Sequence, residues 1–198
     1  MERKRRYELK ERAVKQAETR QRIVDATVAL HREVGPARTT ISEVARRAGV
    51  GRVTVYNHFP DDEALLGACS QQFVEQSPPP DPAEWKAVKD PDARLRSALA
   101  EVYDYYRDNE AILANVGRDA AIVPALAAVL ERSGAAERQA AMADVLMAGR
   151  KLHGKRERRT RAAIGLALAF GTWQRLTGEE GLKDGEAAKL MARAVDAA

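Results

Sequence analysis

Two short helix-forming segments separated by Gly49-Val50-Gly51 constrain this chain more than any other feature. The first begins at Thr40-Ile41-Ser42-Glu43, which has the spacing of a capping box: the threonine hydroxyl accepts from the backbone N–H of Glu43, and the glutamate reaches back. The second, residues 52–59, carries Val55 and Phe59 on one side. A tight glycine turn with small Ala45 at the crossing predicts a helix-turn-helix over residues 40–59.

Apolar residues recur at helical spacing through the remaining chain. A helix over residues 17–34 ends at Gly35-Pro36, and a fourth helix begins after Asp61, its expected cap. Residues 77–82, with a triple proline, predict a loop. Further helices are expected from Asp90-Pro91 onward and over residues 110–116, 123–132, 136–151, 158–176 and 184–197. No segment alternates with a period of two, so the predicted fold class is all-α, without a sheet.

The charge is unevenly distributed. Residues 1–60 contain 14 Lys and Arg against 7 Asp and Glu, a net charge of +7, whereas the remainder contains 19 against 22, a net charge of −3. A basic surface favours a polyanion such as nucleic acid, although a basic face is more often only solvated. Cys69 is the single cysteine, no zinc-site spacing is present, and no signal peptide or membrane span is recognised, so a cytoplasmic protein is expected.

Residues 39–66, TTISEVARRAGVGRVTVYNHFPDDEALL, resemble the DNA-binding segment of the TetR family of bacterial regulators. The matching positions are Thr40, Ala45, Ala48-Gly49-Val50, Thr54-Val55-Tyr56 and His58-Phe59. The resemblance implies a homodimer that binds a palindromic operator, usually as a repressor, and a carboxy-terminal helical domain that binds a small effector and releases the DNA. Two positions depart from the family pattern: Gly51 replaces a capping serine, and Asp62 replaces a lysine that would meet a phosphate.

The same resemblance assigns DNA contacts. Arg52, Val53 and Tyr56 match family positions that contact bases. Arginine can pair with guanine and valine can touch a thymine methyl, so Arg52 is the leading specificity determinant. The positions of Thr40, Thr54 and His58 commonly touch the DNA backbone, and Asn57 can contact either a base or a phosphate. Three of these residues also have an explanation without DNA: Arg52 as a solvated side chain, Tyr56 as a ring packed on the first helix, and His58 as an ordinary surface residue.

The leading residues 1–16 form a basic amino-terminal arm or a helical extension that adds phosphate or minor-groove contacts. Its basic residues are Arg3, Lys4, Arg5, Arg6, Lys10, Arg12 and Lys15. We expect deletion of residues 2–15 to weaken DNA binding and to flatten its salt dependence.

Two domains are predicted: a DNA-binding domain over residues 1–62, with three helices, and an effector-binding and dimerisation domain over residues 63–198. An effector cavity needs apolar walls with a few polar groups. Its candidate residues, each also explicable as ordinary core or surface, are Tyr103, Tyr106, Asn115, Arg118, Asp119, Met142, Met147, Phe170 and Trp173. The last two helices are expected to pair in a dimeric four-helix bundle. The expected interface residues are Gly165, Leu168, Ala169, Gly171, Leu176, Leu190, Met191 and Val195.

Two rival functions stay open. One is a non-specific DNA-binding protein, which a basic end can also produce. The other is a helical enzyme with Cys69 and His153 as a catalytic pair, although Cys69 lies on an apolar helix face, where a packing thiol is commoner. No phosphate loop, nucleophile elbow or paired-carboxylate motif is recognised, so we expect no catalytic residues, no metal site and no cofactor.

Overall fold

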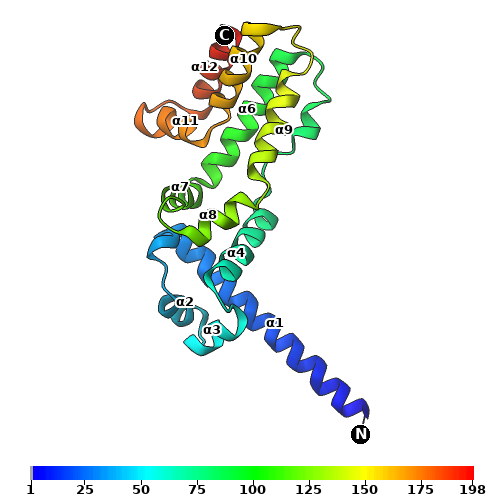
Figure 1. The fold of residues 1–198 in the computed structure, drawn as a ribbon, viewed down its shortest axis with the longest axis vertical. Coiled ribbons are helices and arrows are strands. Elements are labelled where there is room, and N and C mark those ends of the chain that lie inside the picture. Colours follow the sequence, from blue (N-terminus) through cyan, green and yellow to red (C-terminus); the bar gives the residue numbers. More distant parts are fainter. Residues whose placement is uncertain (1) are drawn as a thin grey trace. The chain divides into compact units, whose positions relative to one another are not determined.

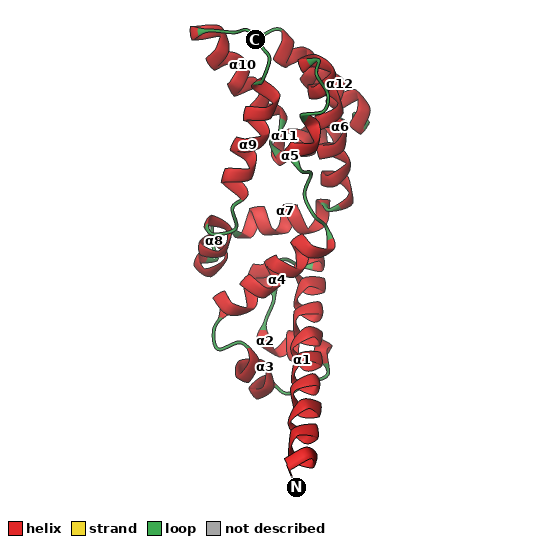
Figure 2. Cartoon of the chain, turned by 90° about the vertical axis from the view of Figure 1, so that its right-hand side faces the viewer, coloured by secondary structure: helices red, strands yellow, loops and turns green. Residues whose placement is uncertain are grey.

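The computed structural model describes the backbone of residues 2–198 and the side chains of Tyr7 and residues 9–198. Over these residues every regular element is helical and no strand occurs, which confirms the predicted all-α class (Figure 2). The elements are α1 Glu2–Glu33, η1 Pro36–Arg38, α2 Ile41–Ala48, α3 Arg52–His58, α4 Asp62–Gln76, α5 Pro82–Trp85, α6 Pro91–Asp108, α7 Glu110–Asp119, α8 Pro124–Glu131, α9 Ala135–Met147, α10 Gly154–Ala167, α11 Phe170–Gln174, η2 Arg175–Glu179 and α12 Asp184–Asp196.

The chain forms two compact units. Unit 1 comprises residues 1–77 and 114–133, and unit 2 comprises residues 78–113 and 134–198. By packing, unit 1 therefore extends beyond the domain boundary expected at residue 62, because α4 packs on both α1 and α8. The side chains of Arg3, Lys4, Arg5 and Arg6 in the expected basic arm lie outside the described residues, although the backbone of residues 2–16 belongs to α1.

The helix-turn-helix of unit 1 forms as the sequence predicts. Thr40 caps α2 by accepting a hydrogen bond from the Glu43 backbone N–H at 3.2 Å. The return half of the expected capping box is not formed, since the Glu43 carboxylate instead receives hydrogen bonds from Arg46. Gly49 ends α2 at a φ of 66°, a left-handed conformation that favours glycine. Asp61 caps α4 through the Ala64 N–H, as predicted.

A polar cluster holds the carboxy-terminal end of α1 within unit 1. The buried Asp119 carboxylate accepts from the Ala37 N–H at 2.9 Å and is paired with Arg118 at 2.7 Å. Asn115 donates to the last carbonyl groups of α1, at His31 and Arg32. Gly35 is required here because its φ is 91° and a Cβ would stand 2.4 Å from the Asp119 carboxylate. The cluster fixes the turn that leads from α1 into α2.

Unit 2 has its own hydrophobic core, built from α5, α6, α9, α10, α11 and α12. Leu95, Leu99 and Tyr103 on α6 are fully buried. Val102 is buried beside them, and Tyr106 is half-buried against the core. Asp90 caps this helix through the Ala93 N–H.

The helix expected over residues 158–176 is not continuous. α10 ends at Ala167, and a new helix, α11, begins at Phe170. The Tyr103 and Tyr106 hydroxyls, both on α6, donate to the carbonyl oxygens of Ala167 and Leu168 at 3.0 and 2.7 Å. These two carbonyls would otherwise accept from N–H groups four residues later in one unbroken helix. Long-range side-chain contacts therefore support a break that local periodicity does not reveal.

The expected interface residues of the last two helices fall into two groups. Leu168, Met191 and Val195 are buried in the core of unit 2, so they supply no free apolar surface, and their expected interface role is corrected. Leu190 on α12 is 46% exposed, and Leu166 on α10, which the prediction omitted, is 58% exposed. The remaining expected residues are half-buried or exposed: Gly165, Ala169, Gly171 and Leu176.

Within the described residues, no single helix combines the length and the apolar composition needed to span a membrane. Only α7 and α8 taken together have both, and they are bent by 115° at the break between them.

Candidate nucleic-acid interface

Helix α3, the second helix of the helix-turn-helix, has a buried side and an exposed side. Val55 is 0% exposed and the following Phe59 is 2% exposed, so both anchor α3 to the core of unit 1. Val53 is 72% exposed and Tyr56 is 48% exposed. Arg52 and Asn57 are exposed as well, and none of these four side chains has a hydrogen bond or ion pair within the described part of the chain. The residues expected to contact bases are therefore available for an external partner.

Of the three residues expected to contact the DNA backbone, one is exposed and two are half-buried. Thr40 is exposed at the start of α2 while its hydroxyl serves as the helix cap. A hydroxyl can donate one hydrogen bond while it accepts another, so capping leaves a phosphate contact possible. Thr54 and His58 are half-buried on the side of α3 that faces α1.

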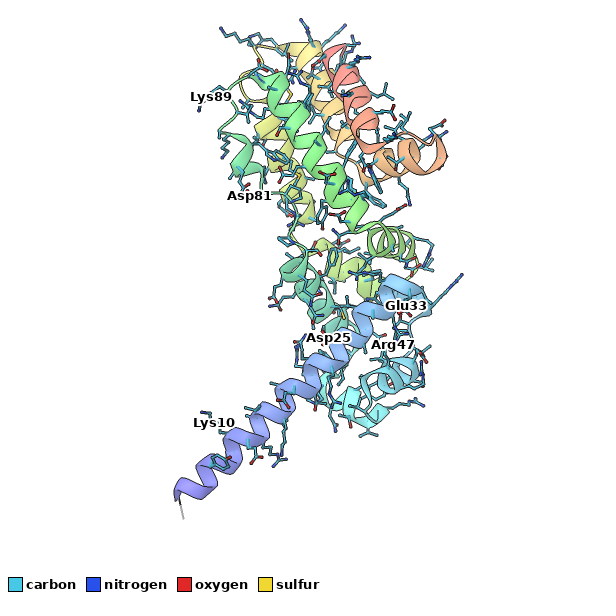
Figure 3. The ribbon with its side chains drawn as sticks, turned by 180° about the vertical axis from the view of Figure 1, so that it is seen from behind. Lys10, Asp25, Glu33, Arg47, Asp81 and Lys89 are labelled. Carbon is cyan, nitrogen blue, oxygen red and sulfur yellow. The ribbon has the colours of Figure 1, made fainter. Side chains whose placement is uncertain are left out.

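Two charged contacts brace the helix-turn-helix against α1. The Arg20 guanidinium lies over the Phe59 ring, 4.6 Å from its centroid. Arg47 on α2 forms a bidentate pair with Glu33 at 2.7 and 2.8 Å (Figure 3). Hydrogen bonding to Arg47 lowers the pKa of Glu33, which keeps the pair charged. Because these contacts hold α2 and the end of α3 on one helix, α1 sets the orientation of the recognition surface.

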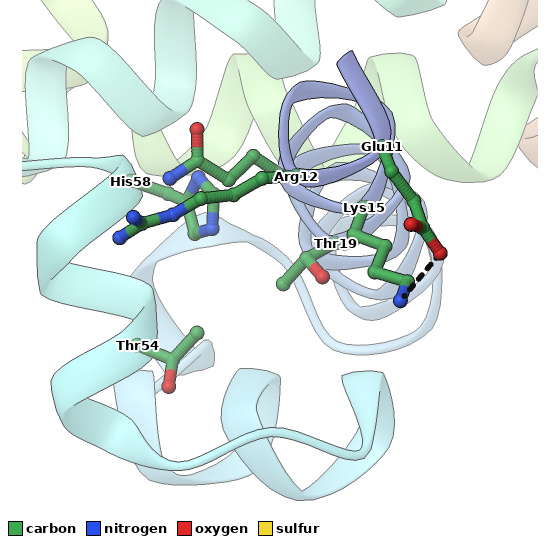
Figure 4. A pocket seen from close by; sticks show the side chains of 7 residues that line it. Glu11, Arg12, Lys15, Thr19, Thr54 and His58 are labelled. Atoms are coloured by element: carbon green, nitrogen blue, oxygen red, sulfur yellow. Dashed lines mark hydrogen bonds and ion pairs between the residues drawn. The ribbon is translucent and has the colours of Figure 1, made fainter. Parts of the chain in front are cut away.

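A groove of about 420 Å³ lies between α1 and α3 (Figure 4). Thr54 and His58 form one wall, and the other wall comes from Glu11, Arg12, Lys15, Gln16 and Thr19. Arg12 reaches across the groove toward His58, while Lys15 is paired with Glu11 at 3.2 Å (Figure 4). The sequence identifies Arg12 and Lys15 only as members of a basic arm and does not predict this groove. The available signal was the recurrence of Arg12, Gln16 and Thr19 on one face of a helix.

The nine candidate effector residues do not form one group. Asn115, Arg118 and Asp119 belong to unit 1, where their polar groups hold the end of α1. The other six lie in unit 2: Tyr103, Tyr106, Met142, Met147, Phe170 and Trp173. Among them, Tyr106 contacts both Phe170 and Trp173, with ring centroids 5.3 and 6.0 Å away. The Trp173 indole N–H donates to Asp184 at 2.9 Å.

Cys69 is buried on α4 and fills space in unit 1. Burial raises the pKa of its thiol to about 12, so the nucleophilic thiolate is scarce at neutral pH. Its position fits a packing role rather than nucleophilic chemistry.

Part of this chain is similar in sequence to known bacterial regulators. Residues 23–69 match the family described as bacterial regulatory proteins, tetR family. The chain is 32% identical over 96 residues to the HTH-type transcriptional regulator BetI of Serratia proteamaculans, a match that covers 48% of each chain. The chain thus spans about half the length of this curated relative.

Solved structures share the fold over most of the chain. A TetR transcription regulator from Haloarcula marismortui has a TM-score of 0.64 at 21% identity, covering 91% of this chain and 98% of that one. A tetR-family transcriptional regulator from Streptomyces coelicolor has a TM-score of 0.61 at 20% identity, covering 91% and 80%. At these identities the likeness concerns the fold. Residues 23–69 therefore carry the DNA-binding segment of the tetR family of bacterial regulatory proteins, and the chain shares its helical fold with solved regulators of that family.

Proposed function

We propose that this protein is a sequence-specific DNA-binding transcriptional regulator that reads its site with α3. The observation that carries the proposal is the outward face of α3, where Arg52, Val53, Tyr56 and Asn57 are exposed while Val55 and Phe59 anchor the helix. A helix presented in this way fits the major groove of B-form DNA, where base edges can be distinguished. The family match over residues 23–69 supports the same function.

The test is selection of bound duplexes from a random DNA pool. We expect the recovered sequences to share an inverted repeat, bound about a thousandfold or more tightly than bulk DNA at the same salt concentration. Two symmetric half-sites would reflect a two-fold assembly. Recovery of sequences with no common motif would reject the proposal in favour of a non-specific DNA-binding protein.

The regulator is proposed to act as a homodimer in the cytoplasm. Leu166 on α10 and Leu190 on α12 are exposed on neighbouring helices that pack on each other in unit 2. Exposed leucines on adjacent helices are suited to a helical interface with a second copy.

Repression relieved by a small effector is the proposed mode of regulation. The aromatic group of Tyr106, Phe170 and Trp173 in unit 2 is the candidate effector region, since aromatic walls suit small apolar ligands. Tryptophan fluorescence during titration with aromatic and aliphatic compounds tests this role, because Trp173 belongs to the group. An unchanged spectrum across a broad panel would reject it.

A further inference from the structure

The amino-terminal half of α1 extends past α2 and α3 (Figure 1). Among its described side chains, those that face α3 are polar. Further along the helix, Ile23 and Leu30 are buried in unit 1. Before Ile23, the same side carries Thr19, Gln16 and Arg12, which line the open groove instead of a packed contact. A helix face that stays directed at α3 but carries hydrogen-bonding groups is suited to a polar partner.

The helical repeat separates the basic residues of α1 into two sides. At about 100° per residue, Arg12, Lys15, Gln16 and Thr19 fall on one side, whereas Lys10 falls on the opposite one. Figure 3 shows Lys10 on the side of α1 away from α2 and α3. The groove therefore holds only part of the basic charge of the arm.

We infer that the groove between α1 and α3 holds one sugar-phosphate strand of the DNA whose bases α3 reads. Arg12 and Lys15 on one wall and Thr54 and His58 on the other then donate to phosphate oxygens, so the strand lies between two helices. This inference rests on the proposed function and adds α1 residues to the DNA-binding surface.

Three features favour a DNA strand as the occupant. The groove adjoins the exposed face of α3, and a recognition helix in the major groove is bordered by the phosphates of that groove. Its lining offers a guanidinium, an ammonium, an amide, two hydroxyls and an imidazole, which are common phosphate donors. The Arg20–Phe59 contact also holds the end of α3 against α1, so the two walls are already positioned before DNA binds.

One lining residue opposes the binding of a phosphate. The Glu11 carboxylate borders the groove and forms an ion pair with Lys15. Docking of a phosphate near Lys15 therefore competes with this ion pair, and removal of the negative charge is expected to strengthen binding. This gives the inference a gain-of-affinity test as well as a loss-of-affinity test.

The experiment measures the dissociation constant against salt concentration for the duplex selected from the random pool. Arg12→Ala and Lys15→Ala are each expected to weaken binding about three- to tenfold and to reduce the magnitude of the log–log salt slope by about 1. Glu11→Gln is expected to tighten binding about twofold or more. Lys10→Ala is the charge-matched comparison on the other side of α1, and its slope is expected to change less.

A scan of the duplex with single methylphosphonate linkages locates the contacts. At one linkage per half-site the wild-type protein should lose affinity, whereas Arg12→Ala should lose none, because its phosphate partner is already missing. The inference is overturned if Arg12→Ala and Lys15→Ala match Lys10→Ala, or if Glu11→Gln fails to tighten binding. If instead the proposed function is wrong, the wild-type protein itself selects no common sequence. Circular dichroism of each variant verifies that α1 remains folded.

Discussion

At the residue scale, position on a helix decides what each side chain of α3 can do. Val55 and Phe59 are buried and hold the helix in place, whereas Arg52 is exposed at its first turn. Arg52 makes no hydrogen bond or ion pair within the described residues, so its removal should leave the fold unchanged. Its long side chain and forked donors suit a bidentate contact with guanine.

We expect Arg52→Ala to weaken binding to the selected site by about 1–3 kcal/mol and to relax sequence preference at one base pair of each half-site. Binding to random-sequence DNA should change much less. Competition assays with base-substituted duplexes measure both effects. A uniform loss on all sequences would instead assign Arg52 to the DNA backbone.

His31 supplies a second prediction, on stability. Its ring is 5% exposed, and burial lowers its pKa from 6.5 to about 4, although the nearby Asp119 carboxylate acts in the opposite direction. A lowered folded-state pKa means that the unfolded chain binds the proton more readily. His31 therefore contributes stability that is present above about pH 6.5 and is lost as the pH falls toward 4.

The expected slope from His31 approaches about 1.4 kcal/mol per pH unit between these values. Denaturant unfolding followed by far-ultraviolet circular dichroism at pH 7 and pH 5 measures it. His31→Gln, which removes the titrating group, should flatten the dependence in this window. An equally steep dependence in that variant would exclude His31 as its source.

At the element scale, the break between α10 and α11 shows how two side chains support a helix end. Tyr103 and Tyr106 donate to the carbonyl groups of Ala167 and Leu168, where the helix stops. Burial raises the pKa of both phenols, to about 12 for Tyr106, so both remain protonated donors across the accessible pH range.

We expect Tyr103→Phe and Tyr106→Phe each to lower the free energy of unfolding by about 1–2 kcal/mol, because a carbonyl group inside unit 2 loses its donor. Tyr105→Phe is a matched control, since the Tyr105 hydroxyl makes no hydrogen bond within the described part of the chain. Tryptophan fluorescence follows the transition, because Trp85 and Trp173 both belong to the core of unit 2. Equal losses in all three variants would contradict this account.

At the scale of the whole molecule, the proposed dimer depends on apolar surface that unit 2 leaves exposed. We expect Leu166→Glu combined with Leu190→Glu to yield a monomer in sedimentation velocity. Tight binding to an inverted repeat should be abolished, because a separate monomer then binds each half-site. Ile122→Glu, at another exposed apolar position, should leave the dimer intact. A double variant that remains dimeric would place the interface elsewhere.

The helix-turn-helix and the ends of most helices follow from residues that lie close together in the chain. Thr40, Gly49, Asp61 and Asp90 act through contacts with residues only a few positions away, so their patterns can be recognised without a fold. The inward direction of Val55 and Phe59 follows from the same short-range helical period.

Other features of the fold and of the candidate site depend on how the helices pack. The break after Ala167, the burial of Leu168, Met191 and Val195, and the groove between α1 and α3 all depend on residues distant in sequence. Helical periodicity predicts that one side of α1 or α12 differs in polarity from the other, but it does not predict which element packs on that side. Packing determines the partner, because apolar area is buried and polar groups find hydrogen-bond partners only when two elements come together.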